Sequence, residues 1–149
     1  MVEIAGSLDT QLICICGKNE KLAARLRSLS RPSPTFVEGF TQQVRYYMKL
    51  SDFFIGKPGP GSISEALAMK LPVIVERNAW TLQQERYNAE WIVKSQVGIV
   101  LRNFREIAGA VAELLRPENY ARFRAAAAAR NNQAVFEIPG ILEKILESK

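Results

Sequence analysis

A loop rich in glycine and proline carries the clearest chemical signal in this sequence. It reads Lys57-Pro-Gly-Pro-Gly-Ser62 and lies between an apolar run and a helical pattern. Glycine lets the backbone come close to a ligand, and the free N–H groups and dipole of a helix start attract an anion. The context indicates a diphosphate site at Gly59, Gly61 and Ser62. A tight turn from strand to helix would use the same residues for geometric reasons alone.

Glu65 lies three residues after Ser62 and has two interpretations. Ser62-Ile-Ser-Glu65 has the pattern of a capping box, in which the carboxylate accepts a hydrogen bond from the backbone of Ser62. Alternatively, the carboxylate faces a ligand and accepts two hydrogen bonds from a ribose diol. The spacing alone favours the cap.

A second polar group follows the next apolar run, in Gln83-Gln-Glu-Arg-Tyr-Asn88. Gln84 and Asn88 are four residues apart and therefore share a helical face, with Glu85 beside them. Amides and a carboxylate near a helix start suit the hydroxyl groups of a sugar. A solvated first helical turn has the same composition, and without further context it is the simpler interpretation.

Chemistry that depends on histidine is excluded within these 149 residues, because none is a histidine. This removes Ser-His-Asp and Cys-His catalysis and every metal site that uses imidazole. Cys14 and Cys16 lie in an apolar run and point to one strand face, and such a pair without further ligands is not a zinc pattern. Acid–base chemistry would therefore need a carboxylate of this chain or a base from elsewhere. We assign no catalytic residue from these patterns, and we expect no metal site and no cofactor.

The composition is that of an ordinary globular chain, 48% hydrophobic and 23% charged. Its net charge of +5 comes from basic residues that are spread along the chain. Nucleic-acid-binding proteins cluster such residues, so we expect no nucleic-acid partner. No apolar run is long enough to cross a bilayer. A basic surface that attracts anionic lipid or a phosphorylated ligand remains open.

Apolar strands alternate with helical patterns up to residue 101. We expect strands at 12–16, 35–37, 52–55, 72–76 and 97–101, and helices at 19–29, 41–50, 62–70 and 82–94. This order predicts an α/β fold, a Rossmann-like parallel sheet with helices on both faces. Ligands in such sheets bind at the carboxyl ends of the strands, so the loops that follow strands should hold the site.

A helical tail is expected from residue 103 onward, broken at Pro117 and kinked or split at Pro139. Its last segment, 133–147, carries an apolar stripe made of Ile138, Ile141, Leu142, Ile145 and Leu146. Such a stripe could lie on a membrane surface. We expect instead that it packs against its own domain, as is usual for an amphipathic helix.

Four segments in this order resemble one protein family. They are residues 37–40, 51–67, 71–74 and 84–88, and the paired patterns Gly-Pro-Gly-Ser-x-x-Glu-Ala and Gln-Glu-x-x-Asn are more specific together than alone. The chain resembles, over about residues 11–101, the C-terminal nucleotide-sugar-binding domain of the glycosyltransferases of family 28, which have the GT-B fold. The likeness is greatest to the monogalactosyldiacylglycerol synthases.

This resemblance implies a role for each matching residue. Gly59, Gly61 and Ser62 would hold the donor diphosphate, with Lys57 as a nearby cation. Glu65 would take the ribose hydroxyls rather than serve only as a cap. Gln84 and Glu85 would contact the transferred sugar, and Asn88 would order the start of their helix. Phe40 would lie beside the uracil ring.

The resemblance also implies that parts of the enzyme lie outside this sequence. Residues 1–6 resemble the end of the domain's first helix, so we expect a fragment, 1–149, that lacks the first strand, its glycine loop and the acceptor-binding domain with the catalytic base. That strand would lie between strands 12–16 and 52–55. We expect those two strands to close on each other, or another chain, such as a second copy, to fill the gap.

The resemblance implies transfer of galactose from UDP-galactose to diacylglycerol. This chain would bind the UDP-sugar, and the absent domain would bind most of the lipid acceptor. We expect this fragment to be inactive alone. Alternatives are another UDP-hexose or UDP-N-acetylglucosamine as donor, or a non-catalytic subunit that completes a split transferase. A generic nucleotide-binding protein is less favoured. We expect a cytoplasmic protein, or one peripheral to the cytoplasmic face of a membrane.

Overall fold

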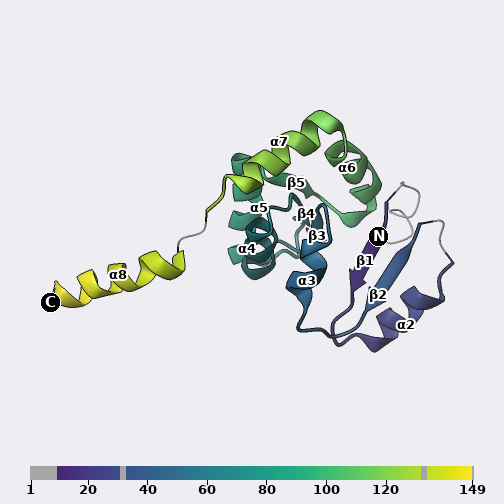
Figure 1. Ribbon diagram of the computed structural model, residues 1–149, viewed down its shortest axis with the longest axis horizontal. Helices are drawn as coiled ribbons and strands as arrows, with labels where there is room; N and C mark the ends of the chain where they lie inside the picture. The colour runs from purple at the N-terminus through teal and green to yellow at the C-terminus, as the bar shows by residue number, and fades with distance from the viewer. Residues whose placement is uncertain (1–9, 31–32, 132–133, 149) are drawn as a thin grey trace.

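The centre of the structure is a parallel sheet of three strands covered by helices on both faces (Figure 1). The computed structural model describes residues 10–30, 33–131 and 134–148. The strands are β3 (Phe54–Gly56), β4 (Val73–Glu76) and β5 (Gly98–Leu101), in the order β3-β4-β5. The first three residues of β4, Val73, Ile74 and Val75, are β-branched and fully buried, as expected for a central strand covered on both faces.

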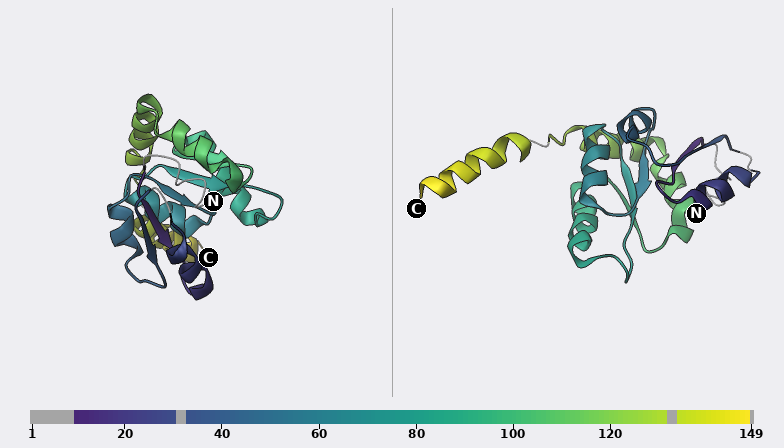
Figure 2. Two further views of the ribbon diagram at one scale, coloured as in Figure 1. Left: turned by 90° about the vertical axis from the view of Figure 1, so that its right-hand side faces the viewer. Right: turned by 90° about the horizontal axis from the view of Figure 1, so that it is seen from below.

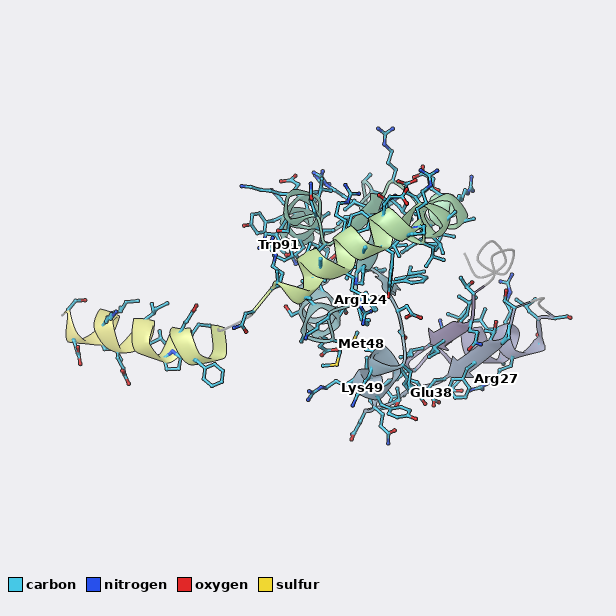
Figure 3. All side chains as sticks on the ribbon, turned by 45° about the horizontal axis from the view of Figure 1, so that its top comes forward. Arg27, Glu38, Met48, Lys49, Trp91 and Arg124 are labelled. Carbon is cyan, nitrogen blue, oxygen red and sulfur yellow. The ribbon has the colours of Figure 1, made fainter. Side chains whose placement is uncertain are left out.

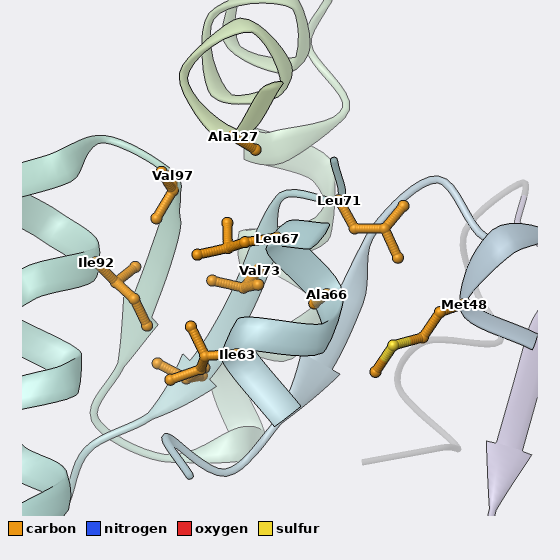
Figure 4. Packing of buried hydrophobic residues seen from close by; sticks show 10 residues of the cluster. Met48, Ile63, Ala66, Leu67, Leu71, Val73, Ile92, Val97 and Ala127 are labelled. Carbon is orange, nitrogen blue, oxygen red and sulfur yellow. The ribbon is translucent and has the colours of Figure 1, made fainter. Parts of the chain in front are cut away.

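Alternate side chains of β4 build two separate cores. Val73 and Val75 point to the face covered by α3 (Val44–Lys49), α4 (Pro60–Ala68) and α5 (Gln83–Ser95). In the close view of this core, Met48 reaches from α3 toward Leu71 and Ala66 (Figure 4). Ile74 points to the opposite face, because successive side chains alternate across a strand.

The opposite face is covered by the helices that follow β5. These are η1 (Phe104–Glu106), α6 (Ile107–Leu114) and α7 (Pro117–Ala128). Ile107, Val111 and Leu114 of α6 pack there with Phe123 of α7. One turn later along α7, Ala127 belongs to the first core. Helix α7 therefore contributes a side chain to each of the two cores.

A smaller parallel sheet of two strands lies beside the first. It contains β1 (Leu12–Ile15) and β2 (Thr35–Glu38), joined by α2 (Glu20–Ser28). Asn19 caps α2 by accepting a hydrogen bond from Leu22 N–H at 3.0 Å. Two further views show the same arrangement, with this unit at the end of the molecule that carries the N-terminus (Figure 2).

The expectation that strands 12–16 and 52–55 close on each other is wrong. Among the described residues, each of them pairs with one neighbour, β1 with β2 and β3 with β4. Pairing requires neighbouring strands to lie about 4.8 Å apart, and no described residue of β1 or β2 belongs to the cores that hold β3 and β4. The expected helix end at residues 1–6 lies outside the described residues.

Helix α8 (Ala134–Glu147) extends away from the rest of the molecule (Figure 1). The expectation that it packs against its own domain is wrong, because its apolar stripe is at least half exposed, from 52% at Ile138 to 71% at Leu146. Pro139 lies inside α8 without splitting it. In the described part of the chain, no helix is both long and apolar enough to cross a membrane.

Candidate functional site

The start of α4 presents backbone N–H groups to solvent at the carboxyl end of β3. Gly59 is the N-cap in an extended conformation and makes no side-chain cap, and Pro60 is the first helical residue. Proline suits this position because its fixed φ matches a helix and it has no N–H to satisfy. The first hydrogen bond back to the cap comes from Ile63 N–H to Gly59 O at 3.2 Å. The N–H groups of Gly61 and Ser62 therefore have no helical acceptor, and both residues are exposed.

The capping box that the sequence predicts at Ser62 and Glu65 is wrong. Because α4 begins at Pro60, Ser62 already lies inside the first turn and cannot be the N-cap. Glu65 is exposed on the same side of the helix, three residues on. Within the described residues, no hydrogen bond or ion pair occupies its carboxylate, which leaves both oxygens available to a ligand.

The start of α5 lies against the loop that precedes α4. A Cβ atom added at Gly59 would lie 3.8 Å from Oε1 of Glu85, so these two sequence motifs meet in space. Asn88 donates a hydrogen bond from Nδ2 to the carbonyl oxygen of Pro58 at 2.8 Å. Asn88 thus holds the loop against α5, whereas Gln84 is exposed and makes no described bond.

Replacing Asn88 with alanine is expected to lower the free energy of unfolding by about 1–2 kcal/mol, because Pro58 O loses its donor at a buried residue. Urea denaturation measures this loss. Gln84→Ala is the matched control and should change stability by less than about 0.5 kcal/mol. Equal effects of the two substitutions would contradict the tethering role of Asn88.

A second cluster lies at the carboxyl ends of β1 and β2. Phe40 is 64% exposed, and Nζ of Lys18 lies 5.6 Å from the centre of its ring. Gly17, with a φ of +56°, turns the chain after β1. A Cβ at Gly39 would lie 3.9 Å from Gly17 O, so the loops after β1 and β2 touch. The sequence analysis assigned no role to Lys18. The Gly17-Lys18 pair, which follows a strand, is the signal that could have identified it as a candidate site residue.

Glu38 ends β2 with both carboxylate oxygens occupied. Tyr47 donates its hydroxyl proton to Oε2 at 2.6 Å, and Gly39 N–H donates to Oε1 at 2.9 Å. The Tyr47 bond, followed by the Gly39 bond, lowers the pKa of Glu38 below its ordinary value. The same bond raises the pKa of Tyr47. Glu38 therefore stays ionised and fixes the backbone just before Phe40.

Replacing Tyr47 with phenylalanine should raise the pKa of Glu38 toward its ordinary value, because the largest cause of the lowering is removed. A lowered folded-state pKa contributes stability above the ordinary carboxyl range, and this contribution is lost as the pH falls through the lowered pKa. Carbon-13 NMR titration of the glutamate carboxyls measures the change. Tyr46→Phe, next to it on α3, should leave Glu38 unchanged.

The second cluster belongs to the β1–α2–β2 unit, whereas α4 and α5 cover the sheet of β3, β4 and β5. Glu38 lies with Arg27 on the β1–α2–β2 unit, apart from Trp91 and Arg124 on α5 and α7 (Figure 3). The structure thus brings together Gly59, Gly61, Ser62, Glu65, Glu85 and Asn88 around the starts of α4 and α5. It places Phe40 in the other cluster, and Lys57 is exposed on the loop without a described contact to either.

A cavity of about 900 Å³ between α4 and α5 overlaps this site only at Pro60 and Asn88. The rest of its lining includes Ile63, Leu67, Trp91 and Arg130, but none of the glycines of the loop and neither Glu65 nor Glu85. Convergent N–H groups and carboxylates are more specific than volume, so the site is assigned to the helix starts. In the described ranges, no three acidic or cysteine side chains gather to hold a metal ion.

Comparison with a solved structure supports the fold. The spinosyn rhamnosyltransferase SpnG, determined in complex with thymidine diphosphate, superposes with a TM-score of 0.59 at 15% identity. The match covers 80% of this chain and 40% of that one. It confirms the predicted Rossmann-like α/β architecture.

Comparison of sequences identifies the family. Residues 2–141 match the model of the glycosyltransferase family 28 C-terminal domain. The chloroplastic monogalactosyldiacylglycerol synthase of Spinacia oleracea is 33% identical over 147 residues, and synthase 3 of Arabidopsis thaliana is 40% identical over 103 residues. These matches cover 97% and 69% of this chain but only 28% and 22% of the relatives. The chain belongs to the C-terminal domain of glycosyltransferase family 28 and is related to the monogalactosyldiacylglycerol synthases.

Proposed function

We propose that this chain is the donor-binding part of a glycosyltransferase that uses a UDP-sugar. The observation that carries the proposal is the meeting of Glu85 with the uncapped start of α4. Unpaired N–H groups at a helix start bind phosphate oxygens, and a carboxylate nearby accepts hydrogen bonds from sugar hydroxyls. One site therefore offers groups for both halves of a nucleotide-sugar.

Each residue has a part in this proposal. The N–H groups of Gly61 and Ser62 bind the diphosphate, and Lys57 adds a cation from the loop. Glu65 accepts two hydrogen bonds from the ribose diol. Gln84 and Glu85 contact the transferred sugar. In the other cluster, Phe40 lies beside the uracil ring.

The chemistry follows from the diphosphate being the leaving group. Negative charge grows on its oxygens as the bond to the sugar breaks, and the start of α4 stabilises that charge through its dipole and N–H groups. The acceptor hydroxyl must lose a proton to a base, for which we assign no residue in this chain. We therefore propose that the chain is inactive alone.

Galactose as the sugar and diacylglycerol as the acceptor are supported by the names of the relatives. Other UDP-hexoses and UDP-N-acetylglucosamine remain competing donors, since one carboxylate, Glu85, does not define a hexose stereocentre. A diacylglycerol acceptor lies in a bilayer, so the complete enzyme would bind peripherally to a membrane. Thymidine diphosphate in SpnG, another pyrimidine nucleoside diphosphate, is consistent with a UDP donor.

An amide NMR titration with UDP, with ADP as control, tests the proposal. We expect selective shifts at Gly61, Ser62, Glu65 and Phe40 with UDP. Equal shifts with ADP would indicate a generic nucleotide site. The absence of shifts with both nucleotides would contradict donor binding by this chain. Competition of UDP with UDP-galactose, UDP-glucose and UDP-N-acetylglucosamine then distinguishes the sugars.

A further inference from the structure

A second hollow, of about 410 Å³, lies at the carboxyl ends of β4 and β5. Three segments line it: the loop after β4, the start of α5 and the end of β5. Its polar lining consists of Arg77, Asn78, Arg86 and Arg102, and no acidic residue lines it. Three guanidinium groups around one hollow create a positive potential that attracts anions.

This hollow is separate from the site at the starts of α4 and α5. Glu85 and Arg86 are successive residues, so their side chains point about 100° apart around α5. Glu85 lies near Gly59 on the side of α4, whereas Arg86 lines the hollow beside the end of β5. None of the residues assigned to the diphosphate, the ribose or the sugar lines it. A ligand in the hollow would therefore leave the donor site open, and its binding does not depend on the proposed function.

Two of the three guanidinium groups are held in place by the protein. Nη2 of Arg77 lies 2.9 Å from Oε1 of Glu90 on α5. Arg86 donates from Nε to Thr81 O and from Nη2 to Ala79 O, both at 3.4 Å. A guanidinium carries more N–H donors than these bonds use. Both arginines are therefore positioned and still have donors for a ligand.

Arg102 and Asn78 add donors that no described residue uses. Arg102 is exposed, and its guanidinium makes no hydrogen bond or ion pair within the described ranges. Asn78 accepts a hydrogen bond from Trp80 N–H at Oδ1, at 2.9 Å, which leaves the amide group of its side chain as a donor. The hollow thus offers donors from all three segments that line it.

The charge balance indicates what kind of anion fits. Three arginines and Glu90, the carboxylate that pairs with one of them, have a net charge of +2. Glu76 and Glu106 are also near in the chain, but they accept hydrogen bonds from backbone N–H groups and do not line the hollow. A phosphate monoester carries close to two negative charges at neutral pH, because its second pKa is about 6. A carboxylate or a phosphate diester carries only one.

We propose that this arginine-lined hollow binds a phosphate monoester group. Arg77, Arg86 and Arg102 donate to its terminal oxygens, and Asn78 adds an amide donor. Arginine suits this role because its planar fork of N–H groups matches two phosphate oxygens and its charge does not titrate. The same group occurs on small soluble molecules and on lipid headgroups, and the hollow would recognise it in the same way on both.

Glycerol 3-phosphate is the soluble probe, and its binding to the 149-residue chain is followed by amide NMR at pH 7.5 and constant ionic strength. We expect saturable shifts at Asn78, Ala79 and Arg102. The shifts should be the same with and without saturating UDP, which occupies the start of α4 if the proposed function holds. Dimethyl phosphate, which carries one charge, should bind several times more weakly.

Three substitutions test which side chains hold the phosphate. Arg102→Gln should weaken binding by about tenfold or more, because a charged donor is lost. Arg105→Gln is the matched control, since Arg105 is exposed and does not line the hollow, and it should leave the affinity unchanged. Glu90→Gln should have the opposite effect. It frees Arg77 from its partner and should tighten binding by about twofold to fivefold.

Vesicles distinguish a lipid source from a soluble one. The chain is sedimented with vesicles of phosphatidylcholine alone and with vesicles that also contain phosphatidate, a lipid with a phosphate monoester. Trp80 is 91% exposed in the loop beside the hollow. A phosphate on a lipid should bring this residue to the membrane interface and shift its fluorescence to the blue, and Trp80→Phe should remove the shift. Binding of glycerol 3-phosphate without binding to phosphatidate vesicles indicates a soluble ligand.

Three results would overturn the proposal. The first is that neither glycerol 3-phosphate nor phosphatidate vesicles bind at the hollow. The second is that Arg102→Gln and Arg105→Gln weaken binding equally, which would indicate attraction by the overall positive charge alone. The third is that UDP abolishes the shifts, because the phosphate would then occupy the donor site. Binding at the hollow by a chain that does not bind UDP would count against the proposed function alone.

Discussion

Alanine in place of Gly98 is expected to lower the free energy of unfolding by roughly 3 kcal/mol or more. Its Cβ atom would overlap the carbonyl oxygen of Val73 and lie 2.7 Å from the carbonyl carbon. Both atoms belong to the backbone of the central strand β4, which is fixed between two partners and two cores. Relief would require β4 and β5 to separate, which breaks their ladder. Urea denaturation measures the loss.

Gly109→Ala is the matched control for this substitution. Gly109 lies in α6, is exposed, and has nothing within 4 Å of the Cβ position. Alanine favours a helix over glycine by roughly 0.5–1 kcal/mol, so this variant should be as stable as the parent or slightly more so. A Gly98→Ala protein that unfolds at the same urea concentration as the parent would contradict the close approach of β5 to β4.

Replacing Glu65 with glutamine is expected to weaken UDP binding by about tenfold to a hundredfold while the thermal stability stays unchanged. A hydrogen bond to a charged group contributes roughly 1.5–3 kcal/mol. Glutamine keeps the size of the side chain but loses the charge and one acceptor. Stability should not change, because no described residue bonds to the Glu65 carboxylate. Calorimetric titration with UDP, together with a melting curve, measures both quantities.

Glu118→Gln serves as the control, because Glu118 is an exposed carboxylate in the first turn of α7. It should leave UDP affinity unchanged. If Glu65→Gln lowers stability and leaves UDP affinity intact, the carboxylate serves the helix and the ribose assignment is wrong.

The alternation of strands and helices could be predicted from the sequence because each element has its own local pattern of apolar residues. The β4 run at residues 72–76 and the α5 pattern at 82–94 are each within a residue of the observed elements. Burial on both faces produces a continuous apolar run, and burial on one side produces helical spacing, so either pattern identifies its element without distant contacts.

The start of α4 was predicted two residues too late, for a local reason. Ser62 and Glu65 match a capping box, but Pro60 also suits a first helical position and Gly59 tolerates the N-cap conformation. The proline starts the helix first because its φ is already helical. The sequence thus contained two valid helix starts, and the earlier one prevails.

The separation of the sheets and the place of α8 could not be predicted, because both depend on contacts between distant segments. The stripe at Ile138, Ile141 and Leu142 has the same spacing whether the helix packs on its own domain or on something else. Likewise, the apolar run of β1 shows that it is a strand, but not which strand lies beside its second edge.

The location of both hydrophobic cores affects how unfolding of this protein would be observed. All buried residues of these two cores lie between Met48 and Ala127. Both tryptophans, Trp80 and Trp91, lie in the same region. Fluorescence therefore reports the loss of this region alone, whereas circular dichroism also senses α2 and α8. Because these helices share neither core, the two unfolding curves should not coincide, and one midpoint temperature would not describe the whole chain.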